Sequence, residues 1–288
     1  MLATYWFAGY PAGMGSTVRH AWLRALGVSE MPAAIDLADG RYQHARTFKH
    51  DFFAATGLYE GPSGKVVLKL GRTVSLLGLP MAWLGQWAAD HEADMYRLAE
   101  GVAGVPRCLG RVGRTGFVHA FVEGHPLQRH ERVSDEFFDQ LRAILDELHA
   151  RGMAYVDLEK RENILVGAEG RPWLIDFQIS YPGPQLDEQI HRRYGPGALH
   201  RLVPRALRAY LLARLQAGDH YHLLKHQRRH RPDTLTPEEV AASYRVSKAI
   251  QLHRRLMRPL TLLRRSILKQ LTGRSRSPKQ DGPEFLEG

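Results

Sequence analysis

Short apolar segments separated by polar turns dominate the N-terminal part of the chain. Several have the length and composition of β-strands: residues 41–47, 52–60, 65–70, 105–111 and 116–122. The stretch Gly61-Pro-Ser-Gly64 has the composition of a tight turn and would join two consecutive strands as a hairpin. Because strands joined by a short turn pair antiparallel, the pattern predicts a small antiparallel sheet in this part of the protein.

Two later segments repeat their apolar residues with the period of an α-helix. The first covers residues 83–100, and its apolar face consists of Leu84, Ala88, Met95 and Ala99. The second is predicted from an N-cap at Ser134 to about Ala150. Its inward-facing residues would be Phe138, Leu141, Leu145 and Leu148.

The rest of the chain is predicted to be mostly helical after one further hairpin. Apolar residues 164–166 and 173–175 flank a turn at residues 167–170. Helices are then expected over residues 206–217 and 219–227. Thr236-Pro-Glu-Glu239 is a capping box with proline at the first helical position, so another helix should begin there.

Residues 246–271 form the longest amphipathic pattern. The apolar stripe consists of Leu252, Leu256, Leu260, Leu263, Ile267 and Leu271, and basic residues such as Arg254, Arg258 and Arg265 lie mainly on the other side. A helix of this kind can lie on an anionic membrane surface. The same stripe could instead pack on the preceding domain, and the sequence leaves both alternatives open.

Charge strengthens the membrane alternative, because the excess is confined to the end of the chain. The net charge is +10, but residues 1–190 hold 19 Lys and Arg against 23 Asp and Glu, a net of −4. Residues 191–288 hold 21 against 7, a net of +14. An anionic partner is therefore expected at the C-terminal part.

Composition is otherwise that of an ordinary globular protein. The chain has 288 residues, of which 44% are apolar and 24% charged, enough for one two-lobed domain. A single cysteine, Cys108, excludes an intrachain disulfide. No apolar run reaches the roughly 18 residues that span a bilayer, and the N-terminus lacks a basic signal region. We expect a cytoplasmic protein, or one peripheral on the inner membrane.

Candidate chemistry is concentrated between residues 148 and 178. A loop carrying Asp157 and Asn163 follows the second predicted helix, and the second strand of the later hairpin ends at Asp176. Phosphoryl transfer needs a carboxylate that orients the attacking hydroxyl and oxygen ligands that hold Mg²⁺ against nucleotide phosphates. The order Asp, Asn, two short strands, Asp would supply both.

This order resembles the catalytic and metal-binding loops of the protein-kinase superfamily. The resemblance implies that Asp157 is the catalytic base and that Asn163 and Asp176 are Mg²⁺ ligands, with ATP as the cofactor. Tyr155-Val156-Asp157 and Asp176-Phe177-Gln178 depart from the usual His-Arg-Asp and Asp-Phe-Gly. The departures resemble atypical branches: bacterial lipopolysaccharide-core and Kdo sugar kinases, and the RIO kinases.

The resemblance also assigns residues in the N-terminal part. Lys69 lies in an apolar strand, where a charge is costly unless paired, and would contact the nucleotide phosphates. Its expected ion-pair partner is Glu92 on the following helix, preferred over Asp94 for its longer side chain. Glu123 lies in the segment that would hold adenine through backbone groups. No glycine occurs in residues 47–51, where the usual glycine-rich loop would fall.

The predicted fold is α+β and two-lobed, protein-kinase-like, with a small antiparallel-sheet N-lobe and a mostly helical, shortened C-lobe. The predicted division is an N-terminal arm (1–38), an N-lobe (39–124), a C-lobe (125–235), a basic amphipathic helical extension (236–272) and a disordered tail (273–288).

Two other motifs are weak. The segment Gly9-Tyr-Pro-Ala-Gly13-Met-Gly15-Ser-Thr17 lacks the lysine and the spacing of a phosphate-binding loop. His222, His226 and His230 recur every four residues and could gather a metal ion, but the neighbouring Lys and Arg side chains would repel one.

The favoured function is an ATP- and Mg²⁺-dependent kinase that phosphorylates a hydroxyl of a sugar or of the lipopolysaccharide core, so the acceptor would be a small molecule or a glycolipid. The rival enzyme is a serine/threonine protein kinase. A rival of another class is a pseudokinase that only binds its partners. Nucleic-acid binding by the basic tail is disfavoured, because few aromatic residues there could stack on bases.

Overall fold

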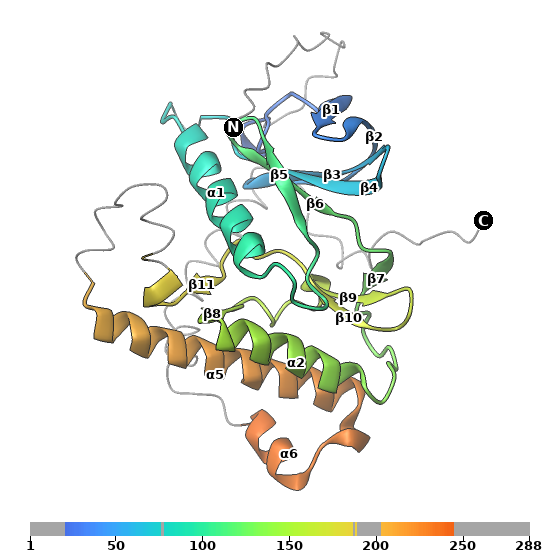
Figure 1. Ribbon diagram of the computed structural model, residues 1–288, viewed down its shortest axis with the longest axis vertical. Helices are drawn as coiled ribbons and strands as arrows, with labels where there is room; N and C mark the ends of the chain where they lie inside the picture. Colours follow the sequence, from blue (N-terminus) through green and yellow to red (C-terminus); the bar gives the residue numbers. More distant parts are fainter. Residues whose placement is uncertain (1–20, 76–77, 187, 189–202, 245–288) are drawn as a thin grey trace.

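The computed structural model describes residues 21–75, 78–186, 188 and 203–244. These residues form two lobes, with a curled sheet and one long helix in the upper lobe of Figure 1 and helices below. The described helices are too short or too polar to cross a membrane. The amphipathic segment 246–271, the predicted tail and the glycines near residue 9 lie outside the described residues.

The N-lobe is built on an antiparallel sheet with the strand order β1-β2-β3-β4-β6-β5. Its strands are β1 (Ala34–Leu37), β2 (Gly40–His50), β3 (Ala54–Gly61), β4 (Gly64–Gly71), β5 (Cys108–Val112) and β6 (Gly116–Ala120). The predicted strands all form. The strand β1 was not predicted, and it extends the sheet back into the segment assigned to the N-terminal arm.

Strand alternation gives the two faces of this sheet different roles. In β4, Val66, Leu68 and Leu70 belong to one apolar cluster that Met31 and Ile35 complete. Successive side chains point to opposite faces, so Lys69 faces the other way. Its partner across the ladder is Phe117, which belongs to the second and larger cluster.

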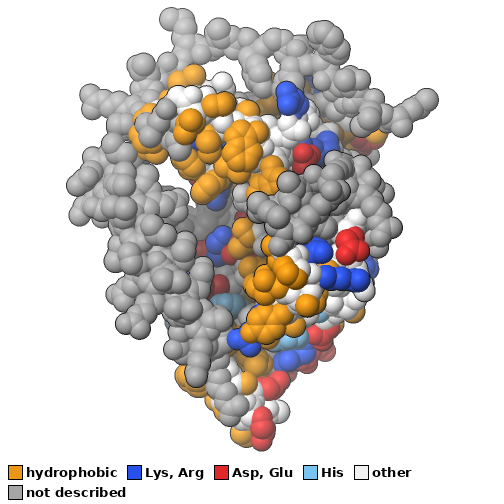
Figure 2. All heavy atoms as spheres, turned by 90° about the vertical axis from the view of Figure 1, so that its left-hand side faces the viewer, with side chains coloured by type: hydrophobic (Ala, Val, Ile, Leu, Met, Phe, Trp, Pro, Cys, Tyr) orange, Lys and Arg blue, Asp and Glu red, His pale blue; other side chains and the backbone are white. Residues whose placement is uncertain are grey.

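Helix α1 (Ala82–Leu98) covers the face that carries Lys69. The helix can approach because Gly71 and Gly85 meet where it begins: a Cβ on Gly85 would lie 2.0 Å from the carbonyl oxygen of Arg72. The outer side of α1 keeps Trp83 and Trp87 exposed, and hydrophobic side chains gather in the upper part of the face that Figure 2 shows.

The C-lobe consists of helices around short strand pairs. Its elements are β7 (Gly124–Pro126), α2 (Phe137–Ala150), β8 (Met153–Ala154), the 3-10 turn η2 (Arg161–Asn163), β9 (Ile164–Gly167), β10 (Pro172–Leu174), β11 (Tyr181–Pro182), α5 (Arg205–His230), the 3-10 turn η3 (Pro232–Thr234) and α6 (Pro237–Tyr244). The predicted hairpin is β9–β10, which β7 extends to three strands.

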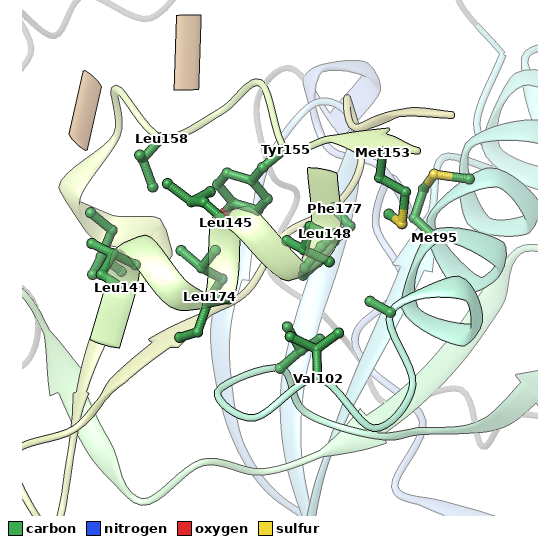
Figure 3. Close-up of a cluster of buried hydrophobic side chains, with 14 of the residues drawn as sticks. Met95, Val102, Leu141, Leu145, Leu148, Met153, Tyr155, Leu158, Leu174 and Phe177 are labelled. Carbon is green, nitrogen blue, oxygen red and sulfur yellow. The ribbon is translucent and has the colours of Figure 1, made fainter. Parts of the chain in front are cut away.

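One apolar cluster joins the two lobes. Met95 and Tyr96 of α1 share it with Leu145 and Leu148 of α2 and with Phe177 after β10. Figure 3 shows Leu145, Leu148, Tyr155 and Phe177 grouped in this cluster. The loop that carries the candidate chemistry therefore lies on the main core of the protein. The structure agrees with the predicted α+β architecture of a small antiparallel-sheet N-lobe and a mostly helical C-lobe.

The predictions for α2 and α5 need correction. Helix α2 begins at Phe137 rather than after Ser134, and its N-cap residue is Glu136, which makes no capping hydrogen bond through its side chain. The two helices predicted over 206–217 and 219–227 are one helix, α5, of 26 residues. Asp219, which looked like the start of a new helix, lies within it and accepts hydrogen bonds from another segment.

Candidate active site

Lys69 is the centre of a buried charge cluster between the lobes. Its Nζ lies 2.7 Å from Glu92 Oε2 and 2.8 Å from Asp176 Oδ1. The Glu92 side chain is 3% exposed and that of Lys69 is 14% exposed, so water screens the attraction little. Glu92 is thus the partner of Lys69, as predicted, and Asp94 instead pairs with Arg97 on the same helix.

The charge state of this cluster follows from one ammonium shared by two carboxylates. Burial lowers the pKa of Lys69, but Glu92 and Asp176 outweigh it and hold the pKa above its ordinary value. Burial raises the pKa of Asp176, yet Lys69 lowers it further, so the net shift is downward. Both groups are therefore charged near neutral pH. Burial raises the pKa of Glu92 to about 7, against the opposing effect of Lys69.

Asp176 is held in an uncommon backbone conformation. Its φ is +63°, in the left-handed region that residues with a Cβ rarely adopt. Two contacts fix it there: its N–H donates to Tyr96 Oη at 3.0 Å, and the following Phe177 is fully buried in the main core. In this conformation the carboxylate contacts Lys69.

Asp157 and Asn163 face each other across the loop. Asn163 Nδ2 donates to Asp157 Oδ2 at 2.9 Å, and Lys160 Nζ donates to the same oxygen at 2.6 Å. Burial raises the pKa of Asp157, an effect that Lys160 and Asn163 oppose. Ile175 N–H donates to the backbone oxygen of Asn163, so the chain segments that carry Asn163 and Asp176 run side by side.

The loop is anchored from behind by helix α5. Both oxygens of Asp219 are used: Tyr155 N–H donates to Oδ2 at 2.8 Å and Val156 N–H to Oδ1 at 2.7 Å. Val156 has a φ of +72°, so the chain turns sharply just before Asp157. Because Asp219 is 1% exposed and ties down this turn, it positions Asp157 without touching it.

Glu123 lies at the connection between the lobes, and its side chain is mostly exposed in an ion pair with Lys65. Its carbonyl oxygen accepts a hydrogen bond from Ala168 N–H at 3.0 Å, and Phe121 N–H donates to Lys65 O at 3.2 Å. These two backbone groups of the connection are engaged within the protein. Adenine binding at Glu123 stays a prediction.

The histidine series on α5 does not form the metal site that its spacing suggested. His226 Nε2 donates to Leu158 O at 2.7 Å, and His230 Nδ1 donates to Glu131 O at 2.9 Å. Both rings thus join α5 to the loops that contain Leu158 and Glu131. Burial lowers the pKa of His226 to about 4, so it is neutral near neutral pH.

Sequence reasoning missed Lys160, Asp219 and Tyr96. Lys160 stands three residues after Asp157, and that proximity is a signal that could have identified it. Asp219 and Tyr96 contact the site from 63 and 80 residues away along the chain, and their local sequence gives no such signal.

Comparison with known proteins shows only distant likeness. No protein-family model and no curated protein matches the sequence. Among solved structures, the chain is similar to the Rio2 kinase of Chaetomium thermophilum in its ADP/Mg²⁺-phosphoaspartate complex, with 19% identity, a TM-score of 0.40, and coverage of 60% of this chain and 70% of that one. Another structure of that kinase has 18% identity and a TM-score of 0.44, and the match covers 68% of this chain and 60% of the other.

Proposed function

We propose that the protein is an ATP- and Mg²⁺-dependent phosphotransferase. The observation that carries the proposal is the pair of ion pairs made by Lys69, with Glu92 of α1 and with Asp176 of the C-lobe. A buried ammonium aligned by one carboxylate suits the α- and β-phosphates of a nucleotide. The second carboxylate, together with the amide oxygen of Asn163, provides the hard oxygen ligands that Mg²⁺ prefers.

The side chains of Asp157 and Lys160 suit the acceptor side of the reaction. Asp157 would accept a hydrogen bond from the acceptor hydroxyl and take its proton as the hydroxyl oxygen attacks the terminal phosphorus of ATP. The bond from that phosphorus to the bridging oxygen would break, and ADP would leave. The ammonium of Lys160 contacts Asp157 Oδ2 in this structure. Its positive charge would lie near the phosphoryl group while that group is transferred. Mg²⁺ would neutralise phosphate charge, and Lys69 and Asp157 hold the two reactants in place.

The acceptor proposed is a hydroxyl of a sugar or of a lipopolysaccharide core. The support is the resemblance of the Tyr155–Asp157 and Asp176–Gln178 motifs to the atypical sugar-kinase branches. The basic C-terminal part also suits an anionic glycolipid. Generic protein substrates are the competing class, so sugar or lipid acceptors and protein acceptors are assayed side by side.

Two isosteric variants test the assignment. Asp176→Asn should abolish the Mg²⁺-dependent rise in melting temperature that ATP gives, because it removes a charged metal ligand. Asp157→Asn should keep that rise but lose about 10²–10⁴-fold in turnover, the usual contribution of a general base. Turnover is measured with Mg²⁺-ATP against sugars, lipid extracts and generic proteins.

Asp139→Asn is a matched control, since Asp139 is exposed on α2 and away from Lys69. If Asp176→Asn responds to Mg²⁺-ATP like the unmodified protein, the metal assignment is wrong. ATP binding without turnover on any acceptor would identify a binding module instead of an enzyme.

A further inference from the structure

A second cluster of ligand-type side chains lies behind the site, where α2 and α5 pack together. Asp146, His149 and His220 each offer one ligand atom, and these atoms lie within 4.8 Å of one another. Two come from adjacent turns of α2, since positions three apart share a helix face, and the third comes from α5. Imidazole nitrogens with one carboxylate suit Zn²⁺ and similar transition metals rather than Mg²⁺.

His149 of α2 is held by a buried carboxylate of α5. Its Nε2 donates to Asp219 Oδ2 at 3.0 Å, and the Asp219 side chain is 1% exposed. Metal-binding histidines usually donate their other ring N–H to a carboxylate, which fixes the tautomer and the ring plane. With Nε2 donating to Asp219, the ring nitrogen of His149 that a metal ion would take is Nδ1.

The other two ligands are close enough to complete a site. His220 Nε2 lies 3.6 Å from Asp146 Oδ1, and in a tetrahedral zinc centre neighbouring ligand atoms are about 3.3 Å apart. The side chains of His220 and Asp146 are 40% and 55% exposed, so both can adjust and the fourth position is open to water. Arg142, the cation on the same helix, is bound by Glu239.

We propose that Asp146, His149 and His220 form a transition-metal site of the Zn²⁺ class that ties α2 to α5. The site lies outside the active site, and its metal takes no part in phosphoryl transfer. Because the helices that supply the ligands are packed together in the folded protein, binding would stabilise the fold. The proposal does not depend on the kinase activity.

The test uses the full-length protein stripped with a chelator. One equivalent of Zn²⁺ should raise the melting temperature, and one equivalent of Co²⁺ should give the visible absorption of a four-coordinate nitrogen and oxygen site, whereas Mg²⁺ should give neither. His220→Gln and Asp146→Asn should each weaken Zn²⁺ binding at least about tenfold, since loss of an outer-shell partner alone costs that much. Both positions are partly exposed, so these variants should fold.

Asp139→Asn removes the same charge from the same helix outside the cluster and should bind Zn²⁺ like the unmodified protein. Two results would overturn the proposal. One is the absence of any Co²⁺ spectrum in the stripped protein. The other is Zn²⁺ binding of equal strength in His220→Gln, Asp146→Asn and the unmodified chain, which would place the metal elsewhere, for example at Asp176.

Discussion

At the scale of single residues, the site depends on charges whose states are set by burial and by one or two partners. Asp157 illustrates this, because burial raises its pKa above the ordinary 3.8 while the ammonium of Lys160 opposes the rise. In its proposed role as general base Asp157 must be deprotonated, so its pKa would set the acidic limb of the rate profile. Lys160→Met removes the opposing ammonium and should move that limb of kcat/KM to higher pH.

The pH profile separates this effect from a general loss of activity. Lys225→Met is the control, since Lys225 pairs with Glu159 of the same loop at 3.0 Å. That variant should leave the acidic limb where it is. An unmoved limb in Lys160→Met, or a shift to lower pH, would show that Asp157 is not the group that titrates.

At the scale of elements, the position of α1 decides whether Glu92 reaches Lys69, and that position depends on Gly85. Replacing glycine by alanine inside a helix usually stabilises a protein by about 0.5–1 kcal/mol. Gly85→Ala should do the opposite, because the new Cβ would lie 2.0 Å from Arg72 O. Overpacking of this kind typically costs about 1–3 kcal/mol. Thermal or denaturant unfolding shows whether the free energy of unfolding falls or rises.

Gly218 offers the matched comparison within α5. A Cβ there would meet no atom within 4 Å beyond its own turn of helix, so Gly218→Ala should stabilise the protein by about 0.5–1 kcal/mol. Gly85→Ala should also weaken ATP binding, since displacement of α1 separates Glu92 from Lys69. If both variants gained stability alike, the close contact between α1 and β4 would not be a constraint in solution.

At the scale of the whole molecule, the uneven charge predicts where the protein binds. Residues 191–288 carry a net charge of +14 against −4 in the rest. We propose that residues 246–271, which lie outside the described residues, bind an anionic membrane surface. Each basic residue near such a surface contributes about 1 kcal/mol and salt screens the attraction, so binding should be reversible.

Leu256→Glu separates membrane binding from packing of the same stripe on the C-lobe. The membrane proposal predicts that the variant keeps its melting temperature but no longer sediments with anionic liposomes at low salt. Leu79→Glu is the control, because Leu79 is 67% exposed in the N-lobe, and it should still sediment. A lowered melting temperature in Leu256→Glu, or an unmodified protein that ignores anionic liposomes, would contradict the membrane proposal.

The longer strands of the N-lobe sheet, the β9–β10 hairpin and the main helices were predictable because each is encoded locally, whereas β1 was not predicted. The alternating pattern predicted β4 and singled out Lys69, the lysine within its apolar run. The capping box at Thr236 forms as predicted, with Glu239 N–H donating to Thr236 Oγ1 at 3.2 Å. Helix boundaries were less predictable: the sequence prediction began a new helix at Asp219. In the structure this residue lies inside α5, and its carboxylate accepts hydrogen bonds from a loop more than sixty residues away.

The sequence by itself therefore determined which residue types were available for chemistry and on which element each lies. The order of Asp157, Asn163 and Asp176, the place of Lys69 in an apolar strand and the family resemblance that they carry were together enough to propose these residues. Only the tertiary structure decided the pairings. Lys69 meets Glu92 and Asp176 because α1 and the C-lobe pack on the same core, and Asp219 reaches the loop because α5 passes behind it. Such contacts join residues far apart along the chain, where neither periodicity nor capping carries information.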